Sequence, residues 1–117
     1  MPKILIVEDD KALHSAYKMI LEKQKYSVLS AYNGQEALDV LADNTVDLIL
    51  LDISMPKMNG IEFLEKFKNT KDVKVIVFSN LDTEKDIDRV YALGAHRYIL
   101  KAWASPQELV KVVRDTL

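Results

Sequence analysis

Acidic, hydroxyl and ammonium side chains follow several separate apolar runs of this sequence. They are Glu8, Asp9, Asp52, Ser79 and Lys101. Carboxylates that converge repel one another and raise one another's pKa values unless a cation neutralises them. Magnesium is a hard cation that takes oxygen ligands of this kind. A carboxylate beside such a cation can attack phosphorus and form an acyl phosphate, and phosphoryl transfer asks mainly for positioning and charge neutralisation. The residue types therefore indicate a phosphate site.

Single members of this set have ordinary explanations. Acidic residues after strands often cap the following helix, and we expect Asp10 to do so. Lys101 alone could be a solvated lysine, and Ser79 alone a loop serine. A lone histidine on a helix is usually a surface residue, so we expect His14 to face solvent rather than to relay phosphate. The combination of the set at strand ends is what favours a phosphate site.

The elements that must position these residues follow from the hydrophobic pattern. Five segments rich in branched residues alternate with five helical patterns, which predicts strands over 3–8, 26–31, 47–52, 74–79 and 96–100. The first, third and fourth carry continuous apolar runs, as strands buried on both faces do. The second and fifth interleave polar residues, as edge strands do. Between the strands, apolar residues recur at helical spacing.

Helix boundaries have their own signals. Ser105 to Glu108 combines an N-cap serine, a proline at the first helical position and a capping-box glutamate. Asn33-Gly34 and Asn59-Gly60 mark turns that enter helices, and Gly94 stands where a helix C-cap is expected.

This alternation predicts an α/β protein with a parallel sheet covered by helices on both faces. Right-handed crossovers, three central strands and two edge strands favour the order 2-1-3-4-5. The expected fold is therefore a flavodoxin-like (βα)5 three-layer sandwich. Ligands of such sheets bind beyond the carboxyl ends of the strands where the order reverses, here the first and third strands.

Length and composition restrict the class of protein. The 117 residues fit one domain, spanning 1–117, and the net charge of −2 predicts no nucleic-acid partner. The sequence has no cysteine, which excludes disulfides and thiolate metal sites. No apolar run approaches the roughly 20 residues of a membrane span, and the start of the chain does not resemble a secretory signal. We expect a cytoplasmic protein without a membrane partner.

The sequence resembles the receiver domains of two-component response regulators from end to end. The matching pieces are KILIVEDD (3–10), LILLDISMPKMNG (48–60), VIVFSN (75–80) and YILKA (98–102). The most specific piece is the Asp-x-x-Met-Pro-x-Met-x-Gly stretch that begins at Asp52, because Ser79 and Lys101 follow it at the family's distances.

The resemblance implies roles for the site residues. Asp52 is expected to be the phosphoacceptor. Asp9 and Asp52 are expected to bind Mg2+ directly, together with the backbone carbonyl of Ser54. Glu8 is expected to act on the metal through a water molecule, and Lys101 to pair with a phosphoryl oxygen.

It also implies a switch and its partners. Ser79 resembles the hydroxyl that moves toward the phosphoryl group, and Tyr98 the aromatic that swings inward, although an edge-strand aromatic is usually plain packing. The expected phosphodonor is a sensor histidine kinase, a histidine phosphotransfer protein or a small acyl phosphate. The expected output is a protein target on the surface of the fourth helix, fifth strand and fifth helix, by a monomer or a phosphorylation-dependent dimer. No enzymatic activity is expected beyond the chain's own phosphorylation and dephosphorylation.

Two positions depart from the family pattern. Ala102 follows Lys101 where proline, often with a cis peptide, is usual, and a cis bond before alanine costs about 2.5–4 kcal/mol. Asn80 follows Ser79 where a small residue is common, and its side chain is expected to narrow access to the phosphoryl group. Trp103 is expected to pack rather than to contact a partner. No output domain follows in this sequence, so it is either a protein that works alone or the receiver part of a longer regulator.

Three other classes of protein would be expected to show different features. A binding module that is not phosphorylated would be expected to lack Asp9, Asp52 or Lys101. A haloacid-dehalogenase-type phosphatase would carry an Asp-x-Asp motif after its first strand and a larger cap. A flavin-binding protein would carry a hydroxyl- or glycine-rich phosphate loop after the first strand.

Overall fold

The computed structural model describes residues 2–53, 58–69, 71–80, 84–101 and 105–117. Five parallel strands form one sheet in the order β2-β1-β3-β4-β5, as predicted. The strands are β1 (Lys3–Val7), β2 (Ser27–Ala31), β3 (Leu48–Leu51), β4 (Lys74–Ser79) and β5 (Arg97–Leu100). The helices are α1 (Lys11–Lys23), α2 (Gly34–Asp43), α3 (Gly60–Lys66), α4 (Glu84–Ala92) and α5 (Pro106–Thr116).

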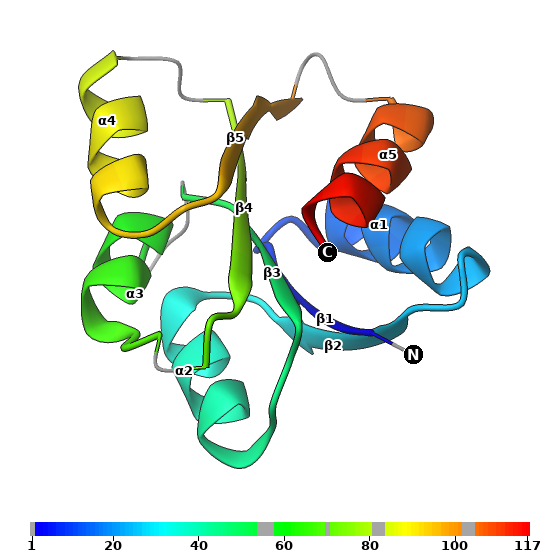
Figure 1. The fold of residues 1–117 in the computed structure, drawn as a ribbon. Helices are drawn as coiled ribbons and strands as arrows, with labels where there is room; N and C mark the ends of the chain where they lie inside the picture. Colours follow the sequence, from blue (N-terminus) through cyan, green and yellow to red (C-terminus); the bar gives the residue numbers. More distant parts are fainter. Residues whose placement is uncertain (1, 54–57, 70, 81–83, 102–104) are drawn as a thin grey trace.

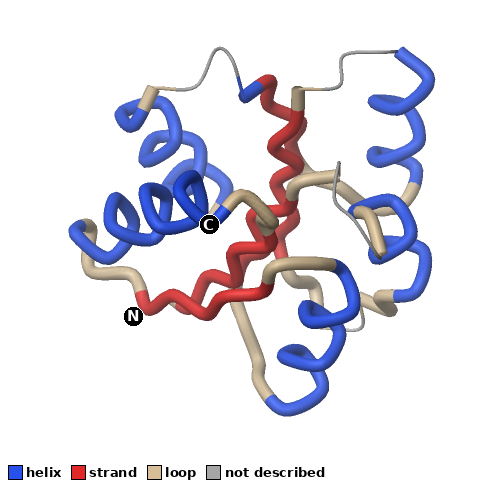
Figure 2. Tube along the Cα trace, turned by 180° about the vertical axis from the view of Figure 1, so that it is seen from behind, coloured by secondary structure: helices blue, strands red, loops and turns tan. Residues whose placement is uncertain are grey.

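The helices cover both faces of the twisted sheet. Helices α1 and α5 lie on one face, and α2, α3 and α4 lie on the other (Figure 1). The same three-layer arrangement is seen from behind in Figure 2. The fold class predicted from the sequence is confirmed.

Each face of the sheet has its own apolar core. One cluster packs alternate strand residues against α2, α3 and α4, and includes Leu5, Ile49 and Phe63. The other packs the intervening strand residues against α1 and α5, and includes Ile6, Leu21 and Leu109. Because both faces are covered, β1, β3 and β4 are buried almost throughout, whereas β2 and β5 are only partly buried. The edge and central strands are therefore those that the hydrophobic pattern indicated.

The caps predicted at Asp10 and Ser105 are present, and Asn33 and Asn59, predicted to mark turns into helices, are caps as well. Side-chain oxygens of Asp10, Asn33, Asn59 and Ser105 each accept a backbone N–H bond in the first turn of α1, α2, α3 and α5. Gly94, which follows α4, has a φ of +106°, a conformation that favours glycine. Among the described residues, no helix is both long and apolar enough to span a membrane.

Gly60, the first residue of α3, lies directly against the residues that follow β3. Its backbone N–H donates to the Ile53 carbonyl at 3.2 Å. A Cβ at this position would lie 2.6 Å from the Ile53 Cα and 2.7 Å from the Asp52 carbonyl oxygen. The absence of a side chain at Gly60 is therefore a condition for the backbone position of Asp52.

We expect Gly60→Ala to reduce the free energy of unfolding by about 1–3 kcal/mol, the usual cost of overpacking. Gly94→Ala is the matched control, because a Cβ there meets nothing within 4 Å and its cost is conformational, about 1–2 kcal/mol. Denaturant unfolding gives both values, and amide chemical shifts locate the disturbance. We expect the amide chemical shifts of residues around Asp52 to change in Gly60→Ala but not in Gly94→Ala. Unchanged chemical shifts there in Gly60→Ala would contradict the close contact.

Candidate functional site

Strand register brings the predicted site residues to one edge of the sheet. Val7 pairs with Leu51, so Glu8 and Asp52 follow at the same level of neighbouring strands. The Asp52 backbone N–H donates to the Val7 carbonyl at 2.9 Å. On the β4 and β5 side of the sheet, Ser79 of β4 pairs with Leu100 of β5. Lys101 therefore lies one residue beyond this pair. Parallel strands therefore present all of these side chains at their carboxyl ends.

The acidic side chains form a compact cluster. One carboxylate oxygen from each of Glu8, Asp9 and Asp52 lies within 4.8 Å of the others. Glu8 is only 2% exposed and Asp52 only 4% exposed, whereas Asp9 is partly exposed. Water can therefore do little to screen the repulsion between Glu8 and Asp52, so both carboxylates stay charged only with a cation nearby.

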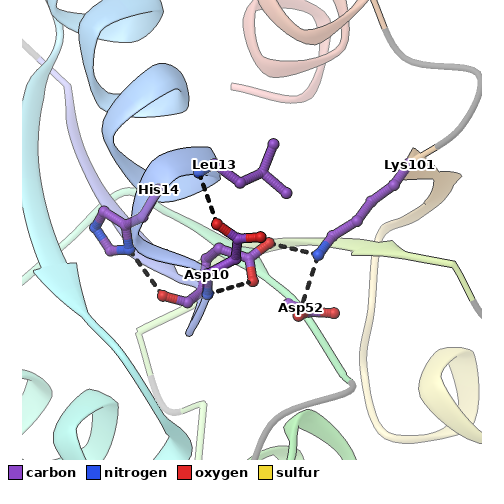
Figure 3. Close-up of polar contacts among 6 residues, drawn as sticks. Asp10, Leu13, His14, Asp52 and Lys101 are labelled. Carbon is purple, nitrogen blue, oxygen red and sulfur yellow. Dashed lines mark hydrogen bonds and ion pairs between the residues drawn. The ribbon is translucent and has the colours of Figure 1, made fainter.

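The Lys101 side chain supplies positive charge to this cluster. Its Nζ lies 2.5 Å from Glu8 Oε1 and 3.2 Å from Asp52 Oδ2 (Figure 3). The side chain is 14% exposed, so the ammonium group reaches the carboxylates from a largely buried position. One lysine thus bridges the ends of β1 and β3 from the end of β5.

The pKa values reflect this crowding. Burial raises the pKa of Glu8 from 4.5 to about 7; Lys101 opposes this shift, and the neighbouring Asp52 adds to it. Burial by itself would lower the pKa of the Lys101 ammonium, but its contacts with Glu8 and Asp52 outweigh burial and raise it. Lys101 is therefore held in its charged form, while Glu8 is poised to take up a proton near neutral pH.

The donor set fits a small hard cation. Three carboxylates with close oxygens offer ligands of the kind that magnesium prefers. Other residues for which we stated expectations from the sequence lie outside the described residues: Ser54, Ala102 and Trp103, together with Met55 and Pro56 of the family motif.

Ser79 and Tyr98, the predicted switch residues, lie on the adjoining strands β4 and β5. Ser79 is fully buried at the last position of β4. Tyr98 pairs with Val77 and packs, half-buried, against the core beneath α2, α3 and α4. Asn80 is exposed and lines a groove together with Tyr17 and Lys101. The roles of Ser79 and Tyr98 stay predictions.

His14 is where the sequence analysis was wrong. It was expected to face solvent but is 1% exposed. It lies on the inner face of α1 with Tyr17 and Leu21, at positions i, i+3 and i+7. That spacing was available in the sequence as a signal of burial. The direct Glu8–Lys101 ion pair was also not foreseen, because no spacing rule relates residues so far apart along the chain.

Fold and site together define a class of protein. It is a doubly wound α/β domain with carboxylates clustered at the carboxyl ends of its strands. Residues 4–114 match the family model of the response regulator receiver domain. The chain belongs to this family. This membership favours the receiver interpretation over the phosphatase and flavin-binding alternatives.

Particular relatives agree with this membership. The chain is 40% identical over 117 residues to the transcriptional regulatory protein CpxR of Escherichia coli, covering 100% of this chain and 50% of CpxR. The chain thus spans about half the length of this curated relative.

Solved structures agree as well. A CheY-like receiver domain protein from Methanospirillum hungatei JF-1 superposes with a TM-score of 0.92 at 32% identity, covering 98% of this chain and 92% of that one. TrrA from Thermotoga maritima, solved in complex with Mg(2+)-BeF, has a TM-score of 0.88 at 30% identity, with 100% of both chains covered.

We expect the stability of the metal-free protein to fall as pH rises from about 4.5 to about 7 because of Glu8. A raised pKa means that the folded state holds the Glu8 proton more tightly than the unfolded state does. Its contribution is therefore fully present below pH 4.5 and is lost as pH rises through about 7. The free energy of unfolding is expected to differ by at most about 3 kcal/mol between the two ends of this pH interval.

Denaturant unfolding at several pH values in chelator-treated buffer checks this prediction. Glu8→Gln keeps the shape of the side chain and removes the titration, so its curve is expected to be flatter over this interval. Parallel curves for the parent and Glu8→Gln would contradict the assignment.

Proposed function

We propose that Asp52 accepts a phosphoryl group in a magnesium-dependent reaction, and that its phosphorylation switches a protein-binding surface. The observation that carries this proposal is the position of Asp52. Its carboxylate is buried, lies among two other carboxylates, and contacts the Lys101 ammonium group at 3.2 Å.

These positions support the following reaction. A carboxylate oxygen of Asp52 attacks phosphorus, the bond from phosphorus to the donor's nitrogen or oxygen breaks, and its electron pair leaves with the donor. The donor we propose is a phosphohistidine on a sensor kinase or phosphotransfer protein, or a small acyl phosphate. Asp52 can act because it is held at a fixed place at the strand end, and phosphoryl transfer depends mainly on positioning and charge.

The added charge must be neutralised. A phosphoryl group brings about −1.5 to −2 of charge into a cluster that already holds three carboxylates. Lys101 already contacts Asp52, so a small movement of Nζ away from Glu8 would bring it to a phosphoryl oxygen.

Magnesium is the cofactor that we propose, with Asp9, Asp52 and the Ser54 carbonyl as direct ligands and Glu8 acting through water. When bound, it would neutralise charge on the carboxylates and on the transferred group. The Mg(2+)-BeF complex of the related TrrA supports this assignment.

The switch that we propose runs from the site to the edge strand. Ser79 would turn toward the phosphoryl group, and Tyr98 would move into the space that it leaves. An apolar groove beside Tyr98 is lined by Ile87 of α4, Ile99 and Leu100 of β5, and Val112 of α5. A change at Tyr98 would therefore alter the surface that we propose for a downstream protein target.

This proposal treats residues 1–117 as one receiver domain that signals through partners. Its expected location is the cytoplasm, without nucleic-acid or membrane contacts of its own, and as a monomer or a phosphorylation-dependent dimer. The only catalysis that we propose is its own phosphorylation and dephosphorylation.

Intact-mass measurement after incubation with acetyl phosphate and Mg2+ tests the phosphoacceptor. The parent is expected to gain one phosphoryl group, and Asp52→Asn to gain none. Asp10→Asn is the matched control, because Asp10 lies at the same edge but caps α1, a task that asparagine also performs. Equal labelling of the parent and Asp52→Asn, or no labelling of the parent, would overturn the proposal.

Asn80→Ala is expected to shorten the lifetime of the phosphorylated protein. Asn80 is exposed beside Lys101, so removing its side chain should open a path for the attacking water. Decay of the phosphoprotein after removal of the donor gives the rate, and a rate equal to that of the parent would count against this role. The other departure from the family pattern is Ala102, and the decay rate of phosphorylated Ala102→Pro tests it in the same way.

A further inference from the structure

His14 is a buried polar residue that the proposed phosphotransfer does not use. It lies on the first turn of α1, behind the acidic cluster, and is 1% exposed. Its Nδ1 lies 3.0 Å from the backbone carbonyl oxygen of Glu8. Figure 3 shows this contact on the opposite side of the cluster from Lys101.

The geometry fixes the role of each ring nitrogen. A carbonyl oxygen can only accept, so Nδ1 must carry the proton that it donates to Glu8. Nε2 is buried and has no hydrogen-bond partner among the described residues. Burial lowers the pKa of His14, which agrees with a neutral ring that is protonated on Nδ1 alone.

The His14 ring has a second contact, with an aromatic side chain. It stacks on the ring of Tyr32, with ring centroids 4.4 Å apart. Tyr32 lies between β2 and α2, and the backbone N–H of Gly34, the first residue of α2, donates to the Met58 carbonyl at 2.9 Å. The connection from β2 into α2 therefore contacts His14 of α1 through Tyr32, and Met58, which follows Asp52 along the chain, through Gly34.

We propose that His14 is a positioning residue for the cation site. The Glu8 carbonyl belongs to the peptide that joins Glu8 to Asp9, and this peptide is planar. The bond from His14 Nδ1 therefore sets the plane from which both carboxylates project. The proposal rests on the proposed function, because it assigns His14 to the binding of magnesium by the same residues.

The first test needs no substitution. Long-range 1H–15N spectra of the parent report which ring nitrogen of His14 carries the proton. A neutral ring protonated on Nδ1 is expected. A proton on Nε2 would remove the bond to Glu8 and overturn the proposal.

The second test compares two substitutions that differ in where they place a donor. His14→Asn puts an amide N–H close to the position of Nδ1, and His14→Gln puts it close to that of Nε2. Both lose the stacking on Tyr32, so a purely structural role would affect both alike. Calorimetric titration with Mg2+ is expected to show near-parental affinity for His14→Asn and about tenfold weaker affinity for His14→Gln, a usual effect of removing an outer-shell partner. Thermal unfolding without metal measures the shared structural cost.

The outcomes separate this proposal from the proposed function. If the parent binds Mg2+ and both variants bind it equally well, or are weakened equally, His14 has no positioning role and the proposed function stands. If the parent binds no Mg2+, both proposals fall.

Discussion

The Lys101 ammonium lies between two buried carboxylates, those of Glu8 and Asp52, at the carboxyl edge of the sheet. Burial makes charge repulsion costly, because little solvent is present to screen it. A raised pKa at Glu8 and a raised pKa at Lys101 are two consequences of the same crowding. One lysine balances the charge of the three carboxylates only in part, so the cluster favours a divalent cation, and a phosphoryl group on Asp52 would increase that requirement.

The rest of the fold keeps this arrangement in place. Parallel register puts the ends of β1, β3, β4 and β5 at one edge. Two packed cores hold the sheet rigid from both faces. Gly60 allows the chain to return against Ile53, and His14 holds the Glu8 carbonyl from behind. Each contact acts on the backbone that carries a carboxylate, so the positions of the charges depend on packing some distance from them.

The sequence predicted the parts that depend on local patterns. Continuous apolar runs distinguished β1, β3 and β4 from the edge strands. The cap at Ser105 and the helix entries at Asn33 and Asn59 were predicted because they depend on local hydrogen bonding. The convergence of Glu8, Asp9 and Asp52 followed from strand order alone. The Lys101–Glu8 contact could not be predicted, since it depends on side-chain conformations across three strands. His14 was wrongly expected at the surface because its residue type was given more weight than its helical spacing from Tyr17 and Leu21.

A crystal structure of the protein with Mg2+ and beryllofluoride tests the central claim most directly. It shows whether the cation and the phosphoryl mimic both bind at the cluster of Glu8, Asp9 and Asp52. We expect beryllofluoride on an Asp52 oxygen, the cation held by Asp9 and Asp52, and Lys101 Nζ moved from Glu8 to a fluorine. A structure in which Asp52 is unmodified, the cation lies elsewhere and Lys101 still bridges Glu8 and Asp52 would contradict the account.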